Sequence, residues 1–315
     1  MKHNIIEVNN LVKRYAKADR NAIDHISFKI EEGCFFALLG PNGAGKTTTV
    51  SILATTLAKT SGKVTIDGES LDRNPSSIRR KLGVIFQKPS LDQNLTAEEN
   101  VRFHATLYGL YSFQPRYSWM PEDYKKKVRE LSQVLDLKKE MFAPIKTFSG
   151  GMKRKLEIIR SLMHTPKIMI LDEPTSGLDP IARKNLWSYI HSIQKKRQIT
   201  ILLTTHYLEE AEGADHIVII DKGKIVSEGT PHTIKTQLIK EYLTLDAIDR
   251  KKLTNQLAAI KVIVSKTFPL KVTLNQYSAQ EVIKKISVPL TILKIHTPTL
   301  EEAYFEIINT YGTRT

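Results

Sequence analysis

The chain has 315 residues, 41% hydrophobic and 25% charged, with a formal net charge of +14 at pH 7. These values exclude a disordered or fibrous chain and fit one large globular domain, or one large and one small. No apolar run approaches the roughly 18 residues needed to span a bilayer, the first ten residues lack the apolar core of a signal peptide, and Cys34 is the single cysteine, so we expect a cytoplasmic protein. The positive charge admits nucleic acid, an anionic membrane face or an acidic ligand as partner.

The chain opens with two segments, at residues 5–15 and 22–30, in which apolar and polar residues alternate. A period of two predicts strands with one buried face, so we expect an antiparallel sheet here. Three short apolar runs stand at 35–40, 167–173 and 199–206. Each is too short for a helix and ends in a polar turn, which predicts central parallel strands whose carboxyl ends carry function.

The remaining segments divide at a change of pattern near Thr230 and Pro231. Before it, residues 88–163 are mostly helical in character, and residues 216–231 predict a β-hairpin. After it, residues 232–243 predict a helical connector, and the segments 271–275, 278–286, 290–295 and 299–309 predict strand, helix, strand and helix. The last part therefore forms a small α+β unit, in which we find no catalytic motif.

A phosphate-binding loop follows the first apolar run. The sequence "GPNGAGKT" fits G-x-x-x-x-G-K-[ST] and opens an apolar-faced helix. Its glycines allow backbone N–H groups to close around phosphates, while Lys46 reaches the β and γ oxygens and the Thr47 hydroxyl ligates magnesium. The predicted nucleotide contacts are Gly40, Pro41, Asn42, Gly43, Ala44, Gly45, Lys46, Thr47 and Thr48.

Two carboxylates end the second apolar run, "IMILDE". Asp172 stands where a carboxylate holds magnesium through its water shell, and Glu173 stands where one orients or deprotonates an attacking water. Taken alone, an Asp-Glu pair at a strand end is also a common turn. Its presence in one chain with a phosphate loop favours the functional interpretation.

The chain resembles the ATP-binding cassette (ABC) ATPases over roughly residues 4 to 230. Five stretches in the family's order carry the resemblance, and "FSGGMKRKLE", "DEPTSGLDPIAR" and "TTHYLEEAE" look like the daunorubicin-type drug-resistance exporters. Phe148 and Met152 replace the usual Leu and Gln of the signature, whose Ser and two glycines remain. The five stretches are "GPNGAGKTT" (Walker A), "VIFQ" ending at Gln87 (Q-loop), "FSGGM" (signature), "IMILDEPTSGLDP" (Walker B and D-loop) and "LLTTH" ending at His206 (switch histidine).

The resemblance implies an α/β fold with a P-loop NTPase core and parallel sheet, an N-terminal antiparallel β-subdomain and a helical insert. It implies an ATPase domain at 1–230 with a helical subdomain at about 88–163. A connector at 231–244 and a small C-terminal α+β accessory domain at 245–315 would follow.

The resemblance also implies roles for single residues. Two cassettes would pack head to tail, so that Ser149, Gly150 and Gly151 of one contact the γ-phosphate bound by Lys46 of the other. Asp179 would bridge the two cassettes. The other implied roles are catalytic carboxylate for Glu173, γ-phosphate contact for His206, magnesium or water contact for Gln87, magnesium ligand for Thr47 and Asp172, and adenine stacking for Tyr15.

The implied function is magnesium-dependent ATP hydrolysis. The chain would be a subunit that powers a separate transmembrane permease, and we expect the transporter to be an exporter. The protein would lie on the cytoplasmic face of the membrane and dimerise with a second copy or a homologous subunit. The alternative is a soluble ABC protein of ribosomes or nucleic acid. Such proteins usually carry two cassettes or a long coiled-coil insertion, so we expect no nucleic-acid partner.

An aromatic segment, residues 108–127, is longer than we expect in this subgroup. It is either a loop that docks on the membrane subunit or a local satellite cluster of the core. Its aromatic residues are Tyr108, Tyr111, Phe113, Tyr117, Trp119 and Tyr124.

Overall fold

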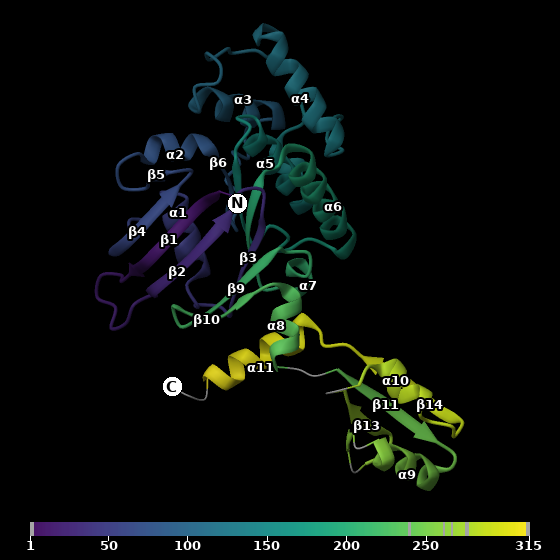
Figure 1. Cartoon of the computed structure of the whole chain (residues 1–315). Helices are drawn as coiled ribbons and strands as arrows, with labels where there is room; N and C mark the ends of the chain where they lie inside the picture. The colour runs from purple at the N-terminus through teal and green to yellow at the C-terminus, as the bar shows by residue number, and fades with distance from the viewer. Residues whose placement is uncertain (1–2, 239–240, 261, 266, 275–276, 313–315) are drawn as a thin grey trace. The chain divides into compact units, whose positions relative to one another are not determined.

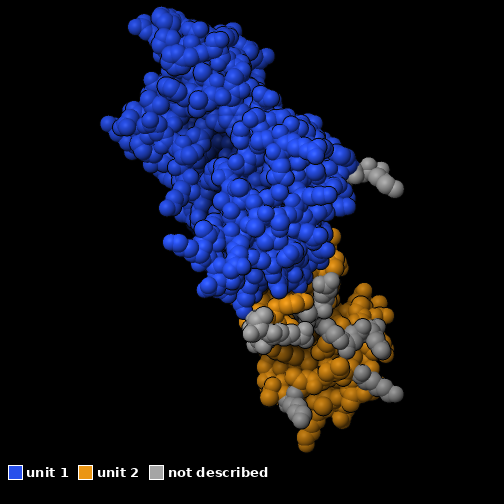
Figure 2. All heavy atoms as spheres, turned by 90° about the vertical axis from the view of Figure 1, so that its left-hand side faces the viewer, with its two compact units in different colours: residues 1–228 blue, residues 229–315 orange. Residues whose placement is uncertain are grey.

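The computed structural model describes residues 3–238, 241–260, 262–265, 267–274 and 277–312. The chain divides into two compact units, 1–228 and 229–315 (Figures 1 and 2). Within the described ranges, no helix combines the length and the apolar character needed to cross a membrane.

An antiparallel sheet begins the first unit, as the alternating pattern predicts. Strands β1 (Asn4–Lys13) and β2 (Ile23–Glu31) pair antiparallel, and the residues of β2 alternate between buried and exposed over most of its length. Two strands that the sequence analysis did not anticipate, β4 (Ser61–Ile66) and β5 (Glu69–Ser70), extend the sheet to the order β2-β1-β4-β5.

A six-stranded sheet forms the centre of the first unit, in the order β10-β9-β3-β8-β7-β6. The three apolar runs are its buried strands, and β3 pairs parallel to β8, which pairs parallel to β7. The predicted hairpin is also confirmed, since Lys222 and Gly223 both take positive φ at the turn between β9 and β10. The strands are β3 (Phe35–Leu39), β6 (Leu82–Ile85), β7 (Ile168–Asp172), β8 (Thr200–Thr205), β9 (His216–Asp221) and β10 (Lys224–Gly229).

Helices cover both faces of this sheet. Successive side chains of β3 point to opposite faces, so their contacts show what packs on each face. The Phe36 ring stacks on Phe28 of the antiparallel sheet, while the Phe35 ring stacks on Trp187 of α6 (Pro180–Arg197). Helix α1 (Lys46–Leu53) contributes buried residues to a single core with strands of both sheets. The apolar face predicted for α6 is confirmed, because Leu186, Tyr189, Ile190 and Ile193 are its buried residues.

The insert between β6 and β7 is helical, as predicted. Its main helices are α3 (Ala97–Leu107), α4 (Glu122–Val134) and α5 (Gly150–Leu162), and α3 packs on α5 (Figure 1). A capping box begins α3, because the Thr96 hydroxyl accepts from Glu99 N and the Glu99 carboxylate accepts from Thr96 N. Short helices α2 (Pro75–Lys81) and α7 (Leu208–Ala211) lie outside the insert.

The aromatic segment in this insert divides into buried and exposed members. Tyr124 is fully buried, and its hydroxyl donates to Glu98 Oε1 at 2.9 Å. Tyr111 and Tyr117 pack edge-on against the Tyr124 ring. Phe113 and Trp119 remain 54% and 58% exposed. The satellite-cluster interpretation therefore describes the tyrosines around Tyr124, whereas Phe113 and Trp119 are left on the surface.

The second unit has a four-stranded antiparallel sheet in the order β12-β13-β11-β14. The predicted helical connector over 232–243 is wrong at its end, because helix α8 (Pro231–Leu238) is followed by strand β11 (Tyr242–Ala247). Leu243 and Leu245 alternate with polar neighbours and lie in the core, so β-sheet packing decides their conformation. The other elements are α9 (Arg250–Ile260), β12 (Ile263–Val264), β13 (Leu270–Thr273), α10 (Ala279–Lys284), β14 (Leu290–His296) and α11 (Leu300–Gly312).

Candidate functional site

The carboxyl ends of β3, β7 and β8 meet at one edge of the parallel sheet, and the predicted phosphate loop starts there. The loop leaves β3 after Leu39 and enters α1 at Lys46. Gly45 has φ +109°, and a Cβ at this position would lie 2.6 Å from the carbonyl oxygen of Ala22. A Cβ on Gly40 would lie 2.2 Å from the carbonyl oxygen of Ile220. The close approach of neighbouring backbone therefore requires glycine at both positions.

Lys46 is buried inside this loop. Its Nζ donates to the carbonyl oxygens of Gly40 at 2.7 Å and Pro41 at 3.1 Å. Burial lowers the pKa of Lys46, and the carboxylates of Glu173 and Asp172 act in the opposite direction. The ammonium group is thus fixed at the mouth of the loop, where an anionic ligand would add to its partners.

Asp172, the last residue of β7, is also buried at this edge. Its Oδ1 accepts from the hydroxyl of Thr204 on β8, and the nearby Thr47 hydroxyl favours the ionised carboxylate. Asp172 Oδ2 is buried and has no hydrogen-bond partner among the residues that the structure describes. Burial raises the pKa of Asp172, because the protein does not fully compensate its charge. A carboxylate oxygen that is buried and unpartnered beside a hydroxyl fits an oxygen-preferring cation such as magnesium.

Magnesium would be held here with few protein ligands. Among the described residues, no group of three or more His, Cys, Asp or Glu side chains could hold a metal ion. Magnesium bound with a nucleotide usually keeps several waters and takes only one or two protein oxygens, so Thr47 and Asp172 fit it.

Glu173 brings three distant segments together. Gln87 Nε2 donates to Glu173 Oε2 at 2.8 Å, and His206 Nδ1 lies 3.4 Å from Glu173 Oε1. The Glu173 backbone has φ +47°, a left-handed conformation uncommon outside glycine, and its N–H donates to the Thr204 carbonyl at 2.9 Å. The structure therefore places Gln87, Glu173 and His206, three predicted site residues, in one cluster.

Arg154 supports this cluster, and the sequence analysis missed it. It lies in α5 and donates to the carbonyl oxygens of Phe86 at 2.7 Å and Gln87 at 2.9 Å. It also pairs with Glu157 Oε2 at 2.8 Å, in a pair that is almost wholly buried. A basic residue three positions before an acidic one is common on exposed helices, so only its burial distinguishes it. Arg154 fixes the backbone that presents Gln87.

The second glycine pair lies on a surface apart from the phosphate loop. Ser149 caps α5, and its Oγ accepts from Met152 N at 3.2 Å. Asp179 caps α6 in the same way and accepts from the N–H groups of Ile181 and Ala182. Within the described part of the chain, no hydrogen bond or ion pair joins Ser149, Gly150 or Gly151 to the phosphate loop. Ser149 and Gly150 are exposed, so these residues present a helix start on the surface of this copy.

Tyr15 borders a cavity of about 450 Å³ that also includes Asn42, Gly43 and Ala44 of the phosphate loop. The Tyr15 side chain is 44% exposed, and its hydroxyl lies 3.2 Å from Thr48 Oγ1. The ring is thus tied to the start of α1 and borders space beside the loop. This is the position expected for a ring that stacks on a base.

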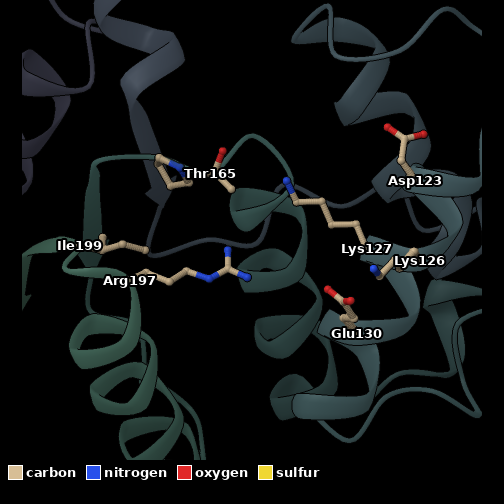
Figure 3. A pocket seen from close by; sticks show the side chains of 8 residues that line it. Asp123, Lys126, Lys127, Glu130, Thr165, Arg197 and Ile199 are labelled. Atoms are coloured by element: carbon tan, nitrogen blue, oxygen red, sulfur yellow. The ribbon is translucent and has the colours of Figure 1, made fainter.

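A separate cavity of about 560 Å³ lies between α4, the turn before β7 and the end of α6 (Figure 3). Lys127 and Arg197 extend into it from α4 and α6, and burial together with Arg197 lowers the pKa of Lys127. No predicted site residue lines this cavity. The chemistry-bearing residues gather instead at the edge of the parallel sheet.

Comparison with known sequences finds one family model and several relatives that are similar to this chain. The family model described as ABC transporter matches residues 23–176. The chain is 38% identical over 233 residues to the probable multidrug ABC transporter ATP-binding protein YbhF of Escherichia coli (strain K12), covering 74% of this chain and 38% of that protein. It is 36% identical over 258 residues to the daunorubicin/doxorubicin resistance ATP-binding protein DrrA of Streptomyces peucetius, covering 81% and 74%. The chain thus spans less than half the length of the first relative.

Solved structures agree on the fold. One is described as the ATP-binding subunit of an ABC transporter and has a TM-score of 0.64 and 31% identity, covering 74% of this chain and 92% of that chain. Another is a dimeric ATP-binding cassette in a post-hydrolysis state, bound to ADP and phosphate. It has a TM-score of 0.64 and 25% identity, covering 71% of this chain and 98% of that chain.

The substitution Asp172→Asn tests the fit of a cation. Without magnesium at neutral pH, we expect the variant to unfold at a temperature equal to or above that of the native protein, because it removes an uncompensated buried charge. Adding magnesium with a nucleotide should raise the unfolding temperature of the native protein, and it should raise the unfolding temperature of the variant much less. Differential scanning fluorimetry measures both. Equal magnesium-dependent shifts in the two proteins would contradict the assignment of Asp172.

Proposed function

The chain belongs to the ABC transporter ATP-binding family, and we propose that it is the ATP-hydrolysing subunit of an exporter. The observation that carries the proposal is the cluster at the sheet edge. Glu173 follows the buried Asp172, and its two oxygens face Gln87 at 2.8 Å and His206 at 3.4 Å. The resistance names of relatives such as DrrA support export as the direction of transport.

ATP would bind with its phosphates in the loop and its adenine against Tyr15. The backbone N–H groups of residues 42–47 and the positive end of α1 favour a polyphosphate. Lys46 is held by loop carbonyl groups and would exchange part of that contact for the β and γ oxygens. The cavity beside Tyr15 gives the base a place next to the loop.

Hydrolysis would use the residues around Glu173. Its carboxylate would accept the proton of the attacking water, while Gln87 and His206 hold that carboxylate in place. Lys46 and His206 would stabilise negative charge on the transferred phosphate oxygens. Thr47 and Asp172 would hold magnesium, with the side-chain oxygen of Gln87 as a further candidate ligand, and the ion would supply positive charge toward the phosphates when bound.

The surface formed by Ser149, Gly150 and Gly151 would complete the site of a second copy or of a homologous subunit. It offers a hydroxyl, backbone N–H groups and a helix start, and these groups favour a γ-phosphate. Asp179 caps α6 beside it, since the Cβ of Ala182 lies 3.7 Å from the position of a Cβ on Gly151. The dimeric cassette among similar structures supports this arrangement.

The partner would be a separate transmembrane permease, and the protein would work on the cytoplasmic face of the membrane through it. ATP-driven closing and reopening of two cassettes would move the permease between its states. The first unit would be the ATPase domain, and the second unit an accessory domain. The names of the relatives give no support to the alternative of a ribosome or nucleic-acid ATPase.

Replacing the carboxylate tests the catalytic assignment. Glu173→Gln should bind ATP and form the closed dimer but lower kcat by a factor of about 10² to 10⁴, as expected when a general base is lost. Steady-state phosphate release measures turnover, and size-exclusion chromatography with ATP measures dimerisation. If the variant turned over ATP at nearly the rate of the native protein, Glu173 would not be the general base.

Gly151→Val tests the shared site. A Cβ here makes only ordinary contacts, at 3.7 Å to Ala182 Cβ and 3.8 Å to Leu178 Cδ2, so the fold should tolerate the change. We expect the monomer to bind ATP with native affinity, because the phosphate loop is untouched, while dimerisation and hydrolysis are lost. Fluorescence titration with an ATP analogue separates the outcomes. Loss of ATP binding by the monomer would mean that Gly151 serves its own chain's phosphate loop.

The exposed aromatics of the insert test the docking interpretation. Phe113→Ser combined with Trp119→Ser should weaken co-purification with a co-expressed permease and leave ATP hydrolysis by the isolated subunit unchanged. Phe305→Ser is the matched control, because Phe305 is 55% exposed and lies in the second unit. Assembly that survives the double change as well as the control would reject the docking role.

A further inference from the structure

We propose that Glu210 is a positioning residue that ties the turn after Glu173 to the turn carrying His206, and so sets the separation of these two groups. The inference rests on the proposed function, because it concerns the geometry of the same hydrolytic site. The connection consists of Glu210, Thr175 and Thr205 and is called the Glu210 bridge below.

Glu210 lies in the short helix α7, four residues after His206, and is 6% exposed. The hydroxyl of Thr175 donates to its Oε1, and the hydroxyl of Thr205 donates to its Oε2 at 2.6 Å. The two threonines are themselves at most 1% exposed. Thr175 lies in the loop that follows β7, and Thr205 is the last residue of β8. One buried carboxylate therefore joins the loop after β7 to the turn that begins at the end of β8.

Thr205 shapes the turn that presents His206. It is the last residue of β8, and its Oγ1 accepts from the N–H of Tyr207 at 3.0 Å while donating to Glu210. The backbone around His206 is thus closed by the same hydroxyl that Glu210 holds. Rotation of the Thr205 side chain away from Glu210 would also release this turn.

Thr175 holds the turn that follows Glu173, as Thr205 holds the turn around His206. The Ser176 N–H donates to the Glu173 carbonyl at 3.2 Å, and the Leu178 N–H donates to the Thr175 carbonyl at 3.0 Å. These bonds make a compact turn between Glu173 and Asp179. The bond from Thr175 to Glu210 anchors this turn to α7, and Arg154 of α5 also donates to the Glu173 carbonyl at 3.5 Å.

Arg183 closes the connection from α6. Its Nε lies 4.0 Å from Glu210 Oε1, and its guanidinium lies 3.8 Å from the centre of the Tyr207 ring. The Tyr207 ring in turn lies 3.9 Å from the His206 ring. The start of α6, which follows Asp179, is therefore in contact with both Glu210 and the residue after the histidine.

These contacts explain why a carboxylate stands at this position. Two hydroxyl donors converge on two acceptor oxygens, and an amide would offer only one acceptor. The burial of a charge is costly unless donors surround it, so the bridge persists only while both loops keep their places. The 3.4 Å separation of Glu173 Oε1 and His206 Nδ1 depends on these same two loops.

The test removes one hydroxyl at a time from the full-length protein. Thr175→Val and Thr205→Val keep the side-chain shape and should lower kcat for ATP hydrolysis about 10- to 100-fold, because small displacements of catalytic groups have effects of this size. The KM for ATP and the affinity for an ATP analogue should change less than about twofold, since no phosphate-binding residue is altered. Thr175→Ser and Thr205→Ser retain the hydroxyl and should restore kcat.

Three further variants sharpen the result. The double variant Thr175→Val with Thr205→Val should lose less than the product of the two single losses, because both act through Glu210. Glu210→Gln should resemble the single valine variants, while Glu209→Gln, a change in the exposed neighbour on α7, should leave kcat unchanged. If a valine variant fails to fold, Glu210→Gln carries the test through its kcat and KM.

Native kcat in the valine variants or in Glu210→Gln, fully multiplicative losses, or no rescue by serine would each overturn the bridge. Parallel loss of kcat and nucleotide affinity would reduce Glu210 to a structural role. Failure of the proposed function gives a different result: native protein and Glu173→Gln would then hydrolyse ATP equally, or neither would hydrolyse it.

Discussion

The structure depends on the burial of opposite charges at one edge of a parallel sheet. Lys46, Asp172 and Glu173 are each at most 8% exposed. Asp172 and Glu173 stand at the end of the apolar strand β7, and Lys46 begins α1 after the loop that leaves the apolar strand β3. Burial lowers the pKa of Lys46 and raises that of Asp172, so the two charges do not fully compensate each other. A site of this kind is completed by a ligand that brings both negative charge for the lysine and a cation for the aspartate.

This constraint accounts for the elements around the edge. Glycine is needed at positions 40 and 45 because neighbouring carbonyl oxygens occupy the space that a Cβ would take. The phosphate loop can then fold closely around Lys46. Arg154 holds the Gln87 backbone from the side of the helical insert. The Glu210 bridge holds the Glu173 and His206 turns from the opposite side. The cluster is thus supported from the helical insert and from the core.

Most of the site could be predicted from the sequence because its motifs are local. Each of these motifs can be recognised within a window of about ten residues: a phosphate loop, a strand ending in two carboxylates and a strand ending in histidine. Arg154 and Glu210 could not be found this way, because each looks like an ordinary helical charge until tertiary packing buries it. Strand β11 was missed for a related reason: Leu243 and Leu245 are also compatible with a helix, and the pairing with β13 and β14 decides against it. Strands β1 and β2, the hairpin of β9 and β10 and the face of α6 followed from periodicity, and β3, β7 and β8 followed from their short apolar runs, whereas β4 and β5 were not anticipated.

The left-handed backbone of Glu173 depends on the contacts that also support the site. For a residue with a Cβ this conformation costs roughly 1 to 2 kcal/mol, so the surrounding contacts must hold it. The Glu173 N–H bonds Thr204, whose own side chain bonds Asp172, and the following turn is anchored through Thr175 to Glu210. The same contacts that stabilise the strained residue also fix its carboxylate toward Gln87 and His206. The strain and the orientation of the catalytic group are therefore consequences of one set of interactions, and loosening any of them would let Glu173 relax away from the site.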